Sequence, residues 1–299
     1  MKTDVSNLLF IDIECARASK ELDINSREYE TYEYKNRDRK TGDLLPSEEL
    51  IDLYNKTAAL SPIYGKVICV SAGFVVGNKF MYKCITGTEA EIITEFFELV
   101  NSSNKVLCGY NLISYDINYL LLRAAANNIT VPLNEKMNTL GKKEWHVSDN
   151  ILDLMVLLKG TGFANYSLDE ITYLLDIDSP KTGVMGHQVS EVYWSGGIDR
   201  IAKYCNEDIL ATARIFLSLQ GQKNLITELI DKTGAKVEKT PLMNAIANTK
   251  SITKEQEKEI VAKAKSLSKE EKLLFVELLN AALLENAVNY EKLLTKLAK

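Results

Sequence analysis

The feature that most constrains this chain is a short apolar segment near its start that carries two acids. Residues 8–16, LLFIDIECA, have the composition of a buried β-strand but include Asp12 and Glu14. Side chains alternate between the two faces of a strand, so these two acids share one face with Leu8 and Phe10. Two carboxylates in that position repel each other and lose hydration. A chain that keeps them needs a partner that compensates their charge.

Length and composition describe an ordinary globular protein. The chain has 299 residues, of which 46% are hydrophobic and 26% charged, which fits one large domain or a domain with an appendage. No apolar run is long enough to cross a membrane, and Met1 is not followed by a secretory leader. We therefore expect a cytoplasmic protein without a membrane partner.

The residues available as metal ligands narrow the choice of ion. The five cysteines have no paired spacing and lie mostly in apolar runs, which is typical of a reducing compartment. With two histidines in the chain, a Cys/His zinc site is disfavoured. Any bound metal would take oxygen ligands, which favours magnesium or manganese. The net charge of -5 argues against a nonspecific electrostatic grip on nucleic acid.

The order of elements indicates an α/β fold. After the first strand comes a charged, tyrosine-rich helical insertion at about residues 20–62, followed by two strands joined at Gly77-Asn78, a helix, a strand and a second helix. The segment ILDLMVLL fits either a strand or a helix, and residues 198–220 form a long helix. We predict a first domain over residues 1–220 and a helical extension over residues 221–299.

Two further acidic motifs follow the first one along the chain. Asn111 ends a strand, and Asp116, which follows Tyr115, lies in the first turn of the next helix. Tyr204 and Asp208 lie one turn apart on the long helix. Each motif alone has an ordinary explanation, such as a strand end in solvent, an acid at a helix N-terminus, or an amphipathic helix.

Taken in order, D-x-E, N-x-x-x-Y-D and Y-x-x-x-D resemble the signature of the DEDD exonuclease superfamily. The residue before Tyr204 is Lys203, where the histidine branch has its histidine, so the chain resembles the tyrosine branch. The nearest resemblance is to predicted 3'-5' exonucleases related to the proofreading domain of family-B DNA polymerases, over about residues 7–219. It implies a ribonuclease-H-like mixed sheet.

The resemblance also implies the roles of the site residues. Two divalent cations, Mg²⁺ or Mn²⁺, would relieve the repulsion at the first strand, with Asp12, Glu14, Asp116 and Asp208 as metal ligands. Tyr204 would orient the attacking water, and the same five residues form the predicted catalytic set. Asn111 and Tyr115 are the predicted contacts to the substrate, a single-stranded DNA 3' end, in DNA replication or repair.

Several alternatives remain open at this stage. The same chemistry serves exoribonucleases, and an inactive binding or assembly module would share the fold. Asp153 is interpreted as a structural acid, not a fifth ligand. The aromatic residues Tyr110, Tyr115, Tyr193 and Trp194 could form a stacking platform, although core packing competes with that use. The C-terminal helices could serve an oligomer or a replication partner.

Overall fold

The computed structural model describes residues 4–103, 105–131, 151–160, 162, 164–179, 183–233 and 262. The chain divides into a compact unit formed by Met1–Phe97 and Lys105–Thr233, and a second unit formed by Glu98–Asn104 and Gly234–Lys299. The candidate site lies in the first unit. Most of the predicted C-terminal extension lies outside the described residues, so its helices and the domain division stay predictions.

Within the described residues, six strands form one mixed sheet in the order β5-β4-β1-β2-β3-β6. β1 (Leu8–Arg17), β2 (Gly65–Val76) and β3 (Lys79–Thr86) are antiparallel neighbours. β4 (Val106–Gly109) and β5 (Ile151–Asp153) extend the sheet in parallel on one side, and β6 (Glu228–Asp231) pairs in parallel with β3 on the other. This is the ribonuclease-H-like arrangement, and the predicted fold class is confirmed.

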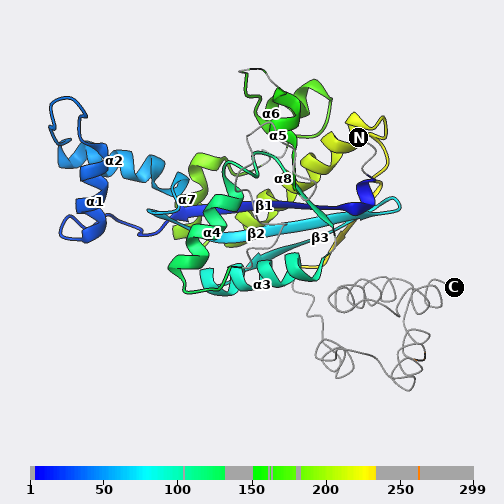
Figure 1. Cartoon of the computed structure of the whole chain (residues 1–299), viewed down its shortest axis with the longest axis horizontal. Coiled ribbons are helices and arrows are strands. Elements are labelled where there is room, and N and C mark those ends of the chain that lie inside the picture. Colours follow the sequence, from blue (N-terminus) through cyan, green and yellow to red (C-terminus); the bar gives the residue numbers. More distant parts are fainter. Residues whose placement is uncertain are drawn as a thin grey trace. The chain divides into compact units, whose positions relative to one another are not determined.

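Helices connect and cover these strands (Figure 1). The helical insertion holds α1 (Arg27–Asn36) and α2 (Ser47–Thr57), whose tyrosines and leucines form a core of their own. The remaining helices of the described part are α3 (Glu89–Ser102), α4 (Asp116–Ala126), α5 (Leu154–Lys159), α6 (Leu168–Leu174), α7 (Val189–Trp194) and α8 (Ile198–Leu219). Short 3-10 turns lie at Val5–Asn7, Ala58–Leu60 and Gly186–Gln188.

Local sequence signals explain where several elements begin and end. Gly77 has a φ of 60° in the turn between β2 and β3, a conformation that glycine adopts without strain. Thr88 and Glu91 cap the start of α3, and Ser167 and Glu170 form a capping box on α6. The ambiguous segment ILDLMVLL is both a strand and a helix, because β5 ends at Asp153 and α5 begins at the next residue.

The long helix α8 packs across β1, β2 and β3 and fixes the site-bearing face of the sheet. Phe10 lies between Phe80 of β3 and Phe216 of α8, with ring centroids 6.2 Å and 6.4 Å away. Because Phe10 faces α8, the strand alternation turns Asp12 and Glu14 toward the same helix. The core therefore positions the first acidic motif against the third.

Candidate active site

Three of the predicted acids meet between β1 and α8. The carboxylate oxygens of Asp12, Glu14 and Asp208 lie within 4.8 Å of one another. Asp208 is buried, and Asp12 and Glu14 are half-buried. The fold thus brings together acids that lie nearly two hundred positions apart in the sequence, as the sequence motifs predict.

Asp116 lies beside this cluster, although it is not a member of the group within 4.8 Å. It is the first residue of α4, is buried, and accepts a hydrogen bond from the backbone N–H of Ile13 at 3.2 Å. That bond ties the start of α4 to the residue between Asp12 and Glu14. Burial, together with the nearby charges of Asp153 and Asp208, raises the pKa of Asp116 to about 8, against the backbone hydrogen bonds that lower it.

The cluster concentrates negative charge in a poorly hydrated place. Burial raises the pKa of both Asp12 and Glu14 well above their usual range, and repulsion from Asp208 and Asp116 adds to it. The thiol of Cys205 donates to Oδ2 of Asp12 at 3.3 Å. In the described part of the chain, no lysine or arginine pairs with Asp12 or Glu14.

A divalent cation fits this arrangement. The donors are carboxylate oxygens, which magnesium and manganese prefer, and they converge on one point from two elements. A bound cation would favour the charged carboxylates, whose pKa values are raised in its absence. Such a cation would supply the compensating charge that the two acids of β1 require.

Tyr204 lies one helical turn before Asp208 on α8 and is close enough to the cluster to interact with it. Burial, followed by the charges of Asp208, Glu14 and Asp12, raises the pKa of its hydroxyl. The phenol therefore keeps its proton at neutral pH and can donate a hydrogen bond, but it cannot serve as a general base.

The two predicted substrate contacts lie in the turn before α4. Asn111 has a φ of 65°, and its backbone carbonyl accepts from the N–H of Tyr115 at 3.1 Å. The hydroxyl of Tyr115 donates to the carbonyl of Ala59 at 3.3 Å, and its ring packs on Tyr119. This is the competing packing role for Tyr115, and substrate contact by either residue stays a prediction.

Asp153 has the structural role that the sequence interpretation gave it. It is buried at the end of β5 and caps α5 through the N–H groups of Met155 and Val156. The same carboxylate accepts from the N–H groups of Asn111 at 3.0 Å and Ile113 at 2.9 Å. It therefore holds the turn that leads to Asp116.

Cys205 is the residue at this site that the sequence motifs did not single out. Its thiol contacts Asp12, and it lies three residues before Asp208, on the same face of α8. That spacing is the one feature of the sequence that points to Cys205 as part of the site. His187 is exposed in the turn before α7, and His146 and Asp149 lie outside the described residues.

A ribonuclease-H-like sheet with acids gathered at β1, α4 and α8 is typical of nucleases of this fold class. The chain belongs to the family of predicted 3'-5' exonucleases related to the exonuclease domain of PolB, whose family model matches residues 62–263. The match includes Asp116, Tyr204 and Asp208, whereas Asp12 and Glu14 precede it. Exonuclease domains of this kind bind nucleic acid and use divalent metals.

Among solved structures, the chain is similar to the family B DNA polymerase from the hyperthermophilic archaeon Pyrobaculum calidifontis. The two share 16% sequence identity with a TM-score of 0.46, over 71% of this chain and 24% of the polymerase chain. The chain thus spans about a quarter of that polymerase. No curated protein matches it. Among the helices that the structure describes, none combines the length and apolar character needed to cross a bilayer.

Proposed function

We propose that this chain is a tyrosine-branch DEDD exonuclease that removes nucleotides one at a time from single-stranded DNA 3' ends. The observation that carries the proposal is the convergence of Asp12, Glu14 and Asp208 within 4.8 Å. Asp116 and Tyr204 interact electrostatically with the same cluster. These five residues are the set that the sequence motifs predict, and a role in DNA replication or repair is part of the proposal.

Asp12, Glu14, Asp116 and Asp208 would hold two Mg²⁺ or Mn²⁺ ions. When bound, the ions would activate the attacking water and stabilise the charge that develops on the phosphate. Tyr204 would donate a hydrogen bond that orients the water for in-line attack. The oxygen of the attacking water would bond to phosphorus while the bond between phosphorus and the 3' oxygen of the penultimate nucleotide breaks. The water would lose a proton to solvent, the 3' oxygen would take one up from solvent, and a nucleoside 5'-monophosphate would be released. Asp153 holds the turn that carries Asn111 and leads to Asp116.

The test is digestion of matched single-stranded DNA and RNA oligonucleotides that are labelled at the 5' or the 3' end. We expect the 3' label to leave at once as a mononucleotide, the 5'-labelled strand to shorten stepwise, and DNA to be the better substrate. Addition of Mg²⁺ or Mn²⁺ should be required.

Asp12→Asn is the matched knockout, because it keeps the shape of the side chain and removes its charge. Loss of activity in this variant with an unchanged circular dichroism spectrum supports the proposal. Activity that persists in Asp12→Asn, or in excess EDTA, contradicts the metal-dependent mechanism. Preferential cleavage of RNA would instead assign the chain to the exoribonucleases of this fold.

A further inference from the structure

Lys66 is the second residue of β2, where that strand lies opposite the part of β1 that follows Glu14. It pairs with Ala16 across the antiparallel β1–β2 ladder, and paired residues present their side chains on one face. Ala16 belongs to the same buried cluster as Cys205 and Ile201 of α8, and strand alternation puts it on the same face of β1 as Glu14. Ala16 lies two positions after Glu14 on β1, which corresponds to about 7 Å between their Cα atoms.

Two aromatic rings of α7 hold the ammonium group of Lys66. Its Nζ lies 4.3 Å from the ring centroid of Trp194 and 4.8 Å from that of Tyr193. The two rings meet edge to face, with centroids 5.2 Å apart. Aromatic faces attract a cation through the ring quadrupole and add no negative charge of their own.

The aromatic pair is itself anchored to the end of β1. Trp194 Nε1 donates to the carbonyl of Arg17 at 3.3 Å. Arg17 is buried, its guanidinium pairs with Glu191 at 2.6 Å, and its N–H donates to Ser190 Oγ at 3.1 Å. Helix α7 is therefore fixed to β1, and the rings lie at a set position beside Lys66.

The neighbours that the structure gives the ammonium group of Lys66 are aromatic rings. The whole chain has a net charge of -5, and in the part that the structure describes no carboxylate pairs with this ammonium. We propose that Lys66, held by Tyr193 and Trp194, binds a backbone phosphate of the single-stranded substrate next to the phosphodiester that is cleaved. This inference rests on the proposed function, and it names how the same site grips its substrate.

The experiment compares Lys66→Met, which keeps most of the aliphatic stem, with Lys66→Arg, which keeps the charge. The control is Lys83→Met, because Lys83 lies on β3 and pairs with Glu95 at 2.7 Å. Two substrates are used: a DNA decamer, and the p-nitrophenyl ester of thymidine 5'-monophosphate, which has no neighbouring phosphate. Both kcat and KM are measured over a series of salt concentrations.

For the decamer, we expect Lys66→Met to lower kcat/KM about fivefold, mainly through KM, and to make the salt dependence shallower by about 0.7 in the log–log slope. The loss should be several times smaller for the ester. Lys66→Arg should retain most of the decamer activity, and Lys83→Met should behave as the wild type. Equal losses on both substrates, or an unchanged salt slope, would overturn the proposal.

The role of the rings is tested by a double-mutant cycle with Trp194→Leu. We expect this change to weaken decamer binding in the wild type and to add little in the Lys66→Met background, with circular dichroism confirming that both variants fold. Additive losses would contradict the proposal that the aromatic rings act by holding Lys66. If the wild type cleaves neither substrate, the proposed function fails, and the salt dependence of decamer binding, measured by fluorescence anisotropy, still decides the role of Lys66. A wild type that does not bind the decamer overturns both.

Discussion

At the scale of single residues, Tyr204 shows how the site favours one of the two roles that a phenol can play, hydrogen-bond donor, over the other, general base. Its hydroxyl lies near three carboxylates, and burial together with their charge keeps the proton in place. Removal of that proton would add a further negative charge to a crowded, poorly hydrated cluster. The side chain can therefore act as a hydrogen-bond donor, and in the proposed mechanism the proton of the attacking water must go elsewhere.

We predict that Tyr204→Phe lowers kcat about ten- to a hundredfold, because it removes an orienting hydrogen bond and leaves the carboxylates in place. Mn²⁺ affinity, measured by isothermal titration calorimetry, should stay close to that of the wild type. The control is Tyr29→Phe, which removes a hydroxyl that contacts Ser47 in the insertion and should leave kcat unchanged. Equal turnover in Tyr204→Phe and the wild type would remove Tyr204 from its assigned role.

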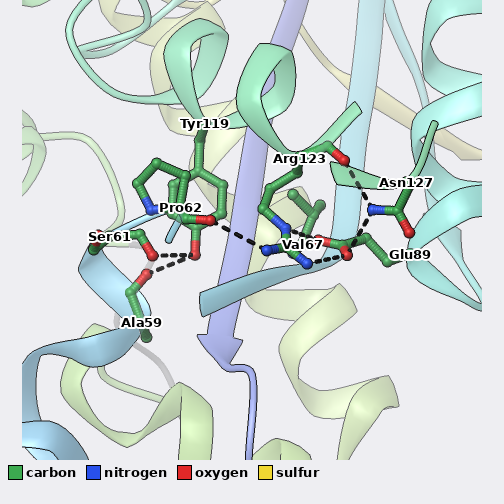
Figure 2. Close-up of polar contacts among 8 residues, drawn as sticks. All are labelled: Ala59, Ser61, Pro62, Val67, Glu89, Tyr119, Arg123 and Asn127. Atoms are coloured by element: carbon green, nitrogen blue, oxygen red, sulfur yellow. Dashed lines mark hydrogen bonds and ion pairs between the residues drawn. The ribbon is translucent and has the colours of Figure 1, made fainter. Parts of the chain in front are cut away.

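At the scale of elements, an ion pair fixes the helix that begins with Asp116 (Figure 2). Arg123 of α4 makes two hydrogen bonds to Glu89 at the start of α3, at 2.6 Å and 2.8 Å. Glu89 also accepts from the N–H of Val67 on β2 and from the side chain of Asn127. One carboxylate thus connects α3, α4 and β2, and the pair is largely shielded from water, with side-chain exposures of 17% and 12%.

We predict that Glu89→Gln lowers the free energy of unfolding by about 2 kcal/mol, because it leaves a largely buried guanidinium without its charged partner. The control is Asp52→Asn, which breaks an exposed pair with Lys56 and should cost less than about 0.5 kcal/mol. Urea denaturation at pH 7 measures both changes. Equal small losses in the two variants would mean that the Glu89–Arg123 pair adds no more than a surface ion pair.

The cost of Glu89→Gln should also depend on pH. Burial raises the pKa of Glu89, but the hydrogen bonds from Arg123, Asn127 and Val67 outweigh it, so the pKa is lowered overall. A lowered folded-state pKa gives stability that is present above the unfolded value of about 4.3 and is lost as the pH falls through the folded value. The stability difference between the wild type and Glu89→Gln should therefore shrink below about pH 4.

At the scale of the whole molecule, the sequence predicts what depends on local pattern and on motif order. The strand alternation of residues 8–16 and the i, i+4 spacing of Tyr204 and Asp208 predict that each motif lies on one face of its element, and the structure brings Asp12, Glu14 and Asp208 within 4.8 Å of one another. A four-residue strand such as β6 has no detectable period, and its place is set by pairing with β3. Nor does any local pattern show that Lys66 lies over Trp194, because that contact depends on where α7 docks.

The position of strand β6 gives a testable prediction of where the nuclease unit ends. It lies within residues 221–299, beyond the predicted domain end at residue 220, and it covers the edge of β3. The segment before it inserts Ile226 into the core that contains Phe10 and Phe216. A chain that ends at residue 220 loses this side chain and exposes a strand edge, which costs stability and invites aggregation.

We predict that a chain of residues 1–233 folds cooperatively, whereas a chain of residues 1–220 is less stable by about 3 kcal/mol, which is the typical cost of removing a buried isoleucine and its neighbours. Urea denaturation and light scattering of the two chains measure the difference. Ile226→Ala in the full chain is the matched control, and it should reproduce most of the loss without removing the strand. Equal stability of the two shortened chains would show that the nuclease unit ends at residue 220 and that β6 contributes nothing to it.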